Sequence, residues 1–252
     1  MLDHPVASRE TWLEARRALL AEEKALTRAR DALAEKRRAL PWVKVDKDYV
    51  FRAHEGQLSL SDLFRGKRQL IVYHFMFGAD WEAGCTGCSF LSDHVDAVIP
   101  HLEQKDVAYV AVSRAPIGRI EAFRRRMGWS FRWVSAADTD FNQDFSASFT
   151  PEQMAGAPAT YNFAPIQPPI EELPGVSVFI RGDDGQIFHS YSQYARGGED
   201  LLAAYRLLDM TPLGRQEAPG QGLGAWVKLH DLYETKAPDE TKAGACPACA
   251  AE

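Results

Sequence analysis

The four cysteines of this chain fall into two pairs with the same spacing. Cys85 and Cys88 stand in the sequence Gly-Cys-Thr-Gly-Cys, and Cys246 and Cys249 stand close to the end of the 252 residues. Four cysteines placed at random would rarely form two Cys-x-x-Cys motifs, so the spacing itself indicates chemistry. Proteins use this motif for reversible thiol–disulfide exchange or for structural zinc binding.

The surroundings of the first pair favour thiol–disulfide exchange. An almost continuous apolar run over 69–77 predicts a strand buried on both faces, and a helical pattern follows over 88–102. A cysteine at the start of a helix faces free N–H donors and the positive end of the helix dipole, which lower its pKa. We therefore predict that Cys85 attacks a disulfide and that Cys88, one turn later, resolves the mixed disulfide. We predict no metal site, because the second pair is remote.

Other residues are candidates for supporting roles. Trp81 precedes the pair and can shield the dithiol, although core packing explains a tryptophan equally well. Asp80 is a candidate proton acceptor. Thr86 and Gly87 separate the cysteines without adding charge, so the reduction potential depends on how strongly the fold stabilises the dithiol. The terminal pair Cys246 and Cys249 is either a mobile accessory dithiol or an appendage without a role.

Strands and helices alternate around the motif and then give way to a hairpin. After the strand at 69–77 and the helix at 88–102, we expect a strand at 107–113, a helix at 117–127, a short strand at 131–135, an irregular excursion at 138–172, strands at 176–181 and 186–192 around a Gly-Asp-Asp-Gly turn, and a helix at 200–209. Short strands are also expected at 49–51 and 58–63. This order is typical of an α/β, thioredoxin-like fold with a peroxiredoxin-like layout, in which helices flank a central sheet.

A long amphipathic helix is predicted before this domain, over 8–40 within an N-terminal segment 1–41. Trp12, Leu19, Leu26, Leu33 and Leu40 recur at every seventh position, as in a coiled-coil seam. Two interpretations stay open. The helix docks on its own domain, or it pairs with a second subunit and makes the protein a homo-oligomer.

The thioredoxin-like domain is expected to span 42–210 and to be followed by two further segments. Residues 211–234 contain Trp226, Leu229 and Tyr233, which predict an extension packed on the domain. Residues 235–252 are polar and poor in anchoring side chains, so we expect a flexible, disordered tail that carries the terminal cysteine pair.

Composition and charge narrow the functional classes. Hydrophobic residues make up 46% of the chain, charged residues 25%, and the net charge is −6, which is ordinary for a soluble globular protein. An acidic surface does not attract nucleic acid, and the longest apolar stretch is too short to cross a membrane. The first residues do not resemble a signal peptide, so we expect a cytoplasmic protein, where cysteines stay reduced unless they cycle. The expected partners are a disulfide or thiol substrate and a reductant, with no cofactor beyond a Cys85–Cys88 disulfide.

Several stretches of the chain resemble domain-of-unknown-function family 899. They are YHFMFGADWEAGCTGCSF (73–90), VAVSRAP (110–116), RRMGWSFRWVS (125–135), LPGVSVFIRGDDGQIFHSYSQYARG (173–197), LLDMTPLGR (207–215) and AWVKLHD (225–231). The resemblance runs to about Tyr233, and it implies a thioredoxin-like fold and a predicted dithiol–disulfide oxidoreductase. Only Cys85 and Cys88 carry over as functional residues.

Two alternative functions remain at this stage: a thiol peroxidase or peroxide sensor, and a non-catalytic binding protein with the same fold. Peroxiredoxins carry Thr or Ser three positions before the reactive cysteine and Pro seven before. Counting back from Cys85, these positions hold Glu82 and Gly78, and the count from Cys88 fails likewise. Thioredoxins also place a proline directly before a core strand, whereas Pro174 is expected to lie too early for that role.

Overall fold

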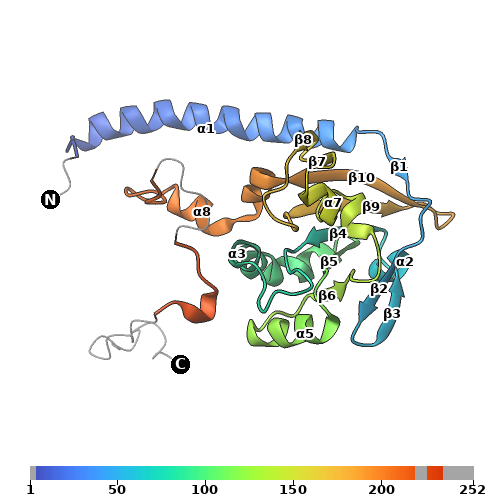
Figure 1. The fold of residues 1–252 in the computed structure, drawn as a ribbon. Helices are drawn as coiled ribbons and strands as arrows, with labels where there is room; N and C mark the ends of the chain where they lie inside the picture. The colour runs from blue at the N-terminus through green and yellow to red at the C-terminus, as the bar shows by residue number, and fades with distance from the viewer. Residues whose placement is uncertain (1–3, 219–225, 235–252) are drawn as a thin grey trace, which may run out of the picture.

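A sheet of eight strands forms the centre of the computed structural model, which describes residues 4–218 and 226–234. The strand order is β1-β10-β9-β4-β5-β6-β2-β3 (Figure 1). Strand β4 (Gln69–His74) runs parallel to β5 (Val107–Ser113), which runs parallel to β6 (Arg132–Ser135). On its other side β4 pairs antiparallel with β9 (Gly175–Arg181), and β9 pairs antiparallel with β10 (Ile187–Tyr194). This arrangement confirms the thioredoxin-like fold predicted from the order of elements.

The helices that connect the parallel strands cover one face of the sheet. Helix α3 (Thr86–Val95) joins β4 to β5 through η1 (Asp96–Val98) and α4 (Ile99–Glu103), and α5 (Ile117–Arg126) joins β5 to β6. Both crossovers are expected to be right-handed, which places these helices on the same face. Their apolar side chains share one core with alternate residues of the strands, including Tyr73, Phe75, Phe90, Phe123 and Trp133.

The opposite face is covered by the segment before β4 and by the short helix α6 (Phe141–Asp144). Strands β2 (Val50–Ala53) and β3 (Gly56–Ser59) form a hairpin there. The prediction of a strand over 58–63 was wrong beyond Ser59, where the chain turns into α2 (Leu60–Leu63). The reason is a capping box: the Ser59 hydroxyl accepts from the Asp62 N–H at 3.2 Å, and the Ser59 N–H donates to the Asp62 carboxylate at 2.8 Å.

The excursion between β6 and β9 contains α7 (Pro151–Met154) and a small hairpin, β7 (Ala159–Tyr161) and β8 (Ala164–Ile166). A buried carboxylate fixes its end to the sheet. Glu172 is 1% exposed, pairs with the Arg114 guanidinium just after β5, and accepts from the Ser148 hydroxyl at 2.7 Å. This anchor determines where the chain enters β9.

Helix α1 (Arg9–Arg38) is the long N-terminal helix, and it begins at the cap residue Ser8, whose hydroxyl accepts from the Thr11 N–H at 3.2 Å. None of its residues is buried. Its C-terminal end lies over β10, with the Arg37 guanidinium 5.5 Å from the centre of the Tyr191 ring, and leads to β1 (Val43–Lys44) (Figure 1).

After β10 the chain returns to the face that carries α3. It forms η2 (Ala195–Leu201) and α8 (Ala203–Leu208), and residues from 226 onward pass along α3 to η4 (His230–Leu232). The Trp226 ring lies 5.5 Å from the Phe90 ring, and the His230 imidazole is 2.7 Å from the Asp93 carboxylate. Cys246, Cys249 and the rest of 235–252 lie outside the described residues. None of the helices in the described part of the chain combines the length and the apolar character needed to cross a bilayer.

Candidate active site

Cys85 and Cys88 lie at the turn between β4 and α3. Cys85 is the N-cap residue of α3 and is partly exposed, whereas Cys88 lies one turn into the helix and is 2% exposed. Both are free thiols. The position of Cys85 places its sulfur at the end of the helix where unpaired N–H groups and the positive dipole favour an anion.

The main chain of Met76, just beyond β4, holds both cysteines. The Cys85 N–H donates to the Met76 carbonyl at 3.0 Å, and the Met76 N–H donates to the Cys88 sulfur at 3.4 Å. On the helix side, the N–H and the hydroxyl of Ser89 both donate to the Cys85 carbonyl at 2.9 Å. These bonds fix the backbone of Cys85 and the sulfur of Cys88 relative to the end of β4.

Gly84 allows the turn to pass close to the aromatic core. A Cβ atom at this position would lie 2.6 Å from the Phe75 ring and 2.9 Å from the Phe123 ring, which is closer than atoms pack. The absence of a side chain at 84 thus seats Cys85 directly on the core, where the rings cannot yield easily.

The two thiols differ in acidity: Cys85 ionises readily, and Cys88 stays protonated and donates a hydrogen bond. The Cys88 thiol donates to the Cys85 sulfur and lowers the pKa of Cys85 to about 6, with help from the N–H groups of Gly87 and Cys88 and against the effect of burial. Burial raises the pKa of Cys88 well above its ordinary value. At neutral pH the negative charge of the pair therefore lies on Cys85.

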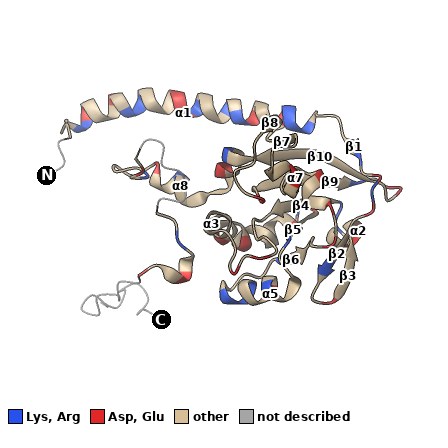
Figure 2. Ribbon diagram, viewed as in Figure 1, with Lys and Arg blue, Asp and Glu red and all other residues tan. Residues whose placement is uncertain are grey.

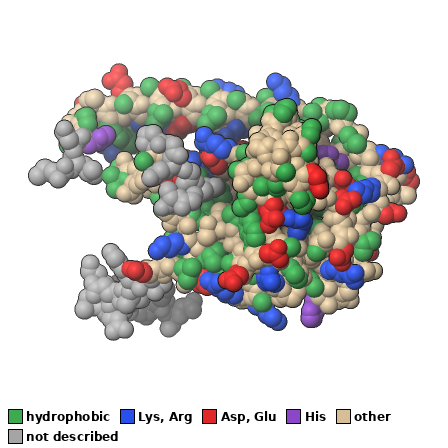
Figure 3. All heavy atoms as spheres, viewed as in Figure 1, with side chains coloured by type: hydrophobic (Ala, Val, Ile, Leu, Met, Phe, Trp, Pro, Cys, Tyr) green, Lys and Arg blue, Asp and Glu red, His purple; other side chains and the backbone are tan. Residues whose placement is uncertain are grey.

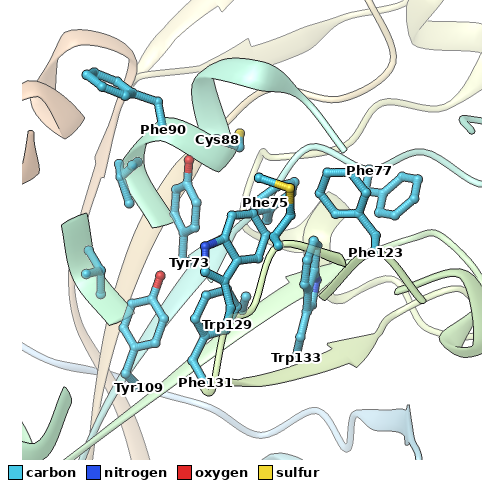
Figure 4. Packing of buried hydrophobic residues seen from close by; sticks show 14 of the residues in the cluster. Tyr73, Phe75, Phe77, Cys88, Phe90, Tyr109, Phe123, Trp129, Phe131 and Trp133 are labelled. Carbon is cyan, nitrogen blue, oxygen red and sulfur yellow. The ribbon is translucent and has the colours of Figure 1, made fainter. Parts of the chain in front are cut away.

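Tyr73 is a site residue that the sequence analysis missed. It rises from β4 toward α3 and points to Cys88, and its hydroxyl acts to lower the pKa of Cys88 against the larger effect of burial (Figure 4). Burial raises the pKa of Tyr73, so the hydroxyl stays a proton donor. The signal was present in the alternation along β4, which sends Tyr73 and Phe75 to the face that carries the cysteine helix.

His74 and His189 lie on the far side of the sheet from the cysteines. The ring nitrogens of His74 lie 2.9 Å from the Asn142 side-chain oxygen and 2.9 Å from the Ser177 hydroxyl. Hydrogen bonds of 2.8 and 2.7 Å continue from Ser177 through Ser192 to His189. Burial lowers the pKa of His74 to about 4, so this ring is a neutral core group and takes no part at the thiols.

A cavity of about 760 Å³ opens beside Cys85 and Cys88. Its floor is the start of α3, its walls come from the entry to β9 and from the segment after β10, and charged side chains occupy its rim. Its apolar and aromatic wall consists of Tyr73, Met76, Leu91, Tyr161, Leu173, Pro174, Val176, Tyr194, Leu202 and Tyr205. Such a volume is typical of a small-molecule site.

Only two of the four residues that were expected to support the motif line this cavity. Thr86 and Gly87 line it, but Trp81 and Asp80 do not. Trp81 packs against Gly78, and its carbonyl accepts from Arg119 at 2.7 Å, which holds the loop before the cysteines. The expectation that Pro174 lies too early to stand directly before a core strand was wrong. Pro174 directly precedes β9 and lines the cavity opposite the cysteines.

Several solved structures are similar to this chain at low identity. They include the PrxQ of Xylella fastidiosa (14% identity, 66% of this chain and 94% of that chain, TM-score 0.43) and peroxiredoxin Q of Xanthomonas campestris (16%, 68% and 98%, 0.41). A putative protein disulfide isomerase of Bacteroides thetaiotaomicron is a third (16%, 68% and 92%, 0.37). The assignment of the fold rests on the strand order described above.

No curated protein matches the chain. A sequence family described as bacterial protein of unknown function (DUF899) matches residues 1–233, which span α1, the sheet and the segment that packs on α3. The resemblance stated from the motifs is thereby confirmed, and the chain belongs to the DUF899 family.

Proposed function

We propose that this protein is a dithiol–disulfide oxidoreductase in which Cys85 attacks and Cys88 resolves. The observation that carries the proposal is the asymmetry of the pair. The pKa of Cys85 is lowered to about 6 at the mouth of a helix and beside a cavity, and the buried Cys88 remains protonated one turn away. A thiolate next to a second thiol is the arrangement that thiol–disulfide exchange requires.

The reaction transfers two electrons from the dithiol to a substrate disulfide. The Cys85 thiolate attacks one sulfur, forms a mixed disulfide and releases the other sulfur as a thiolate. Cys88 then loses its proton and attacks the Cys85 sulfur, which forms the Cys85–Cys88 disulfide and releases the second thiol. A thiol reductant returns two electrons and restores the dithiol, as suits a reducing compartment such as the cytoplasm. No cofactor is needed beyond the cysteine pair.

Two neighbours assist the second step of this scheme. Once the mixed disulfide has formed, the Cys85 charge that opposed ionisation of Cys88 is gone, so the pKa of Cys88 falls. The Met76 N–H donates to the Cys88 sulfur and the Tyr73 hydroxyl acts to lower the pKa of Cys88, so both stabilise its thiolate at that moment. The peroxidase alternative gains no support at Cys85, since Glu82 is exposed and Gly78 is covered by Trp81.

Trapping of the mixed disulfide tests this assignment. We expect Cys88→Ser to accumulate a covalent adduct with a small disulfide such as bis(2-hydroxyethyl) disulfide, because the attacking sulfur remains and the resolving one is absent. Both variants carry Cys246→Ser and Cys249→Ser as well, so that no other thiol reacts. Intact-protein mass spectrometry reads the adduct, and Cys85→Ser is the matched control that should form none. An adduct on Cys88 in the control, or no adduct in either variant, would contradict the proposed roles.

A further inference from the structure

The cavity beside Cys85 indicates which disulfides the site accepts, an inference that rests on the proposed function. Leu91, Leu173, Val176 and Leu202 face the cavity from four different elements or loops. Tyrosines occupy the spaces between them. Apolar walls favour an apolar ligand, because moving such a ligand out of water has no desolvation cost for polar groups.

Charged side chains at the rim already have hydrogen-bond partners within the protein. The Arg196 guanidinium binds Glu199 at 2.6 Å, and Arg215 binds Asp209 at 2.7 Å and Glu199 at 3.4 Å. Glu217 accepts from the Tyr205 hydroxyl at 2.6 Å. The lining thus holds two arginines and two glutamates, all bonded within the protein, so the rim gives no net advantage to either sign of charge.

Main-chain groups beside the cysteines are also used within the protein. A polypeptide substrate docks as a strand by hydrogen bonds to the main chain. Next to the cavity, however, the Leu173 N–H donates to the Ala147 carbonyl at 3.0 Å, and the Pro174 carbonyl accepts from the Tyr161 hydroxyl at 2.7 Å. Pro174 has no N–H, and β9 is paired on both sides. The cavity wall at β9 therefore offers a polypeptide no strand edge.

We propose that the cavity binds the uncharged, apolar arm of a small disulfide, whose sulfur then meets the Cys85 thiolate. The dithiol is oxidised to the Cys85–Cys88 disulfide, and the small disulfide, of the type R–S–S–R, is reduced to two thiols. In this reaction the substrate itself is the oxidant, so a single turnover needs no other reactant.

A matched series of small disulfides tests the proposal. Di-n-propyl disulfide, bis(2-hydroxyethyl) disulfide, cystamine and 3,3′-dithiodipropionate share the chain X–CH₂CH₂–S–S–CH₂CH₂–X and differ in the group X, which is apolar, neutral polar, cationic or anionic. The measurement is the single-turnover rate of oxidation of the reduced protein, divided by the rate of each disulfide with free dithiothreitol. We expect the dipropyl compound to exceed both charged ones by at least about tenfold, the factor that corresponds to 1.4 kcal/mol.

A change of charge in the wall gives a second measurement. Leu173→Glu should slow the dipropyl compound and speed cystamine, whereas Leu207→Glu, at a side chain 60% exposed outside the cavity, should change neither. Equal normalised rates across the series, or a faster reaction with a polypeptide disulfide, would overturn the inference and leave the proposed function standing. If no disulfide oxidises the protein, the proposed function itself fails.

A second inference concerns the apolar stripe of α1, defined by Trp12, Leu19, Leu26 and Leu33. These side chains are between 47% and 54% exposed. The partly covered residues of the helix, such as Leu13, Arg16, Ala34 and Arg37, lie on other rows. Figure 3 shows hydrophobic side chains along the outer edge of the helix. Helices in proteins draw most of their stability from packing of an apolar face. We therefore expect the stripe to be buried against another surface.

The charges of α1 identify that partner as a second copy in the antiparallel orientation. Residues 9–23 carry three arginines and four glutamates, and residues 24–38 carry six basic and two acidic residues. The basic residues at the C-terminal end are visible in Figure 2. Parallel pairing would place the two basic halves together, whereas antiparallel pairing places each beside an N-terminal half, in which glutamates outnumber arginines by one. We infer that α1 forms an antiparallel coiled coil between two chains.

Sedimentation at micromolar concentration tests this interface. The protein should be a dimer, Leu26→Glu should be a monomer, and the control Thr27→Glu, which adds the same charge at an exposed position beside the stripe, should remain a dimer. Energy transfer between dyes on the two N-termini should be weak, because antiparallel helices of 30 residues hold these ends roughly 45 Å apart. A monomeric wild-type protein, a dimer that survives Leu26→Glu or strong energy transfer would overturn the inference.

Discussion

Cys85 in the folded, reduced protein should react with iodoacetamide at pH 6 about twentyfold faster than the same thiol in the chain unfolded by urea, with a midpoint near pH 6. A thiol with a pKa of about 6 is half ionised there, and one with a pKa of about 9 is ionised to roughly 0.1%. The resulting factor of about 500 is reduced to about twenty, because nucleophilicity falls with pKa. The measurement is the alkylation rate of each cysteine against pH, read by peptide mass spectrometry.

Cys88 supplies the control for this result. Its side chain is buried, so it should stay unlabelled in the fold, in wild type and in Cys85→Ser. Because the Cys88 thiol is the main cause of the low pKa of Cys85, Cys88→Ala should raise the midpoint more than Cys88→Ser, whose hydroxyl still donates. Faster labelling of Cys88 than of Cys85, or an unchanged midpoint in Cys88→Ala, would contradict the assignment.

Glu172→Ala should lower the free energy of unfolding by about 3 kcal/mol. Removal of one partner from a buried ion pair leaves the other charge uncompensated, and here it also strips the Ser148 hydroxyl of its acceptor. The loss should be accompanied by slower oxidation of the dithiol, because Glu172 directly precedes Leu173 and Pro174 in the cavity wall. Urea unfolding of the reduced protein measures the stability.

The neighbouring carboxylate provides a matched comparison. The Glu171 side chain is 40% exposed and lies 3.6 Å from the same guanidinium, so Glu171→Ala should cost less than about 1 kcal/mol. Burial raises the pKa of Glu172 although Arg114 opposes this, which means that the ion pair does not fully offset desolvation. Glu172→Gln should therefore be milder than Glu172→Ala. Similar losses at 171 and 172 would refute this account of the anchor.

The hydrophobic pattern of the sequence was sufficient to predict the strands at the core of the fold. Strand β5 occupies the predicted residues 107–113, because both faces of the strand are covered and every residue after Val107 is buried. The hairpin of β7 and β8 was not predicted. Its turn uses Asn162 and Phe163, both with positive φ of 50° and 63°, where a hairpin signal would normally contain glycine.

The candidate site was only partly accessible from the sequence. Cys85 and Cys88 lie three positions apart on one helical turn, so their spacing in the sequence already indicated that they act together. The cavity brings together Cys85, Pro174 and Leu202, which come from segments separated by most of the domain. Their proximity follows from the strand order and from the path of the chain after β10, and no local pattern encodes either.

The two hydrogen bonds at Met76 should make the following loop tolerant of substitutions and intolerant of insertions or deletions. Since the main chain of one residue, Met76, binds the backbone of Cys85 and the sulfur of Cys88, the segment between 76 and 85 is a loop whose ends are tied together. Ala79, Asp80 and Glu82 are exposed on this loop, and their replacement leaves the tie intact. One added or deleted residue would change the span that the tie must close. Across related chains the number of residues in this loop should therefore be constant while the identities at positions 79, 80 and 82 vary.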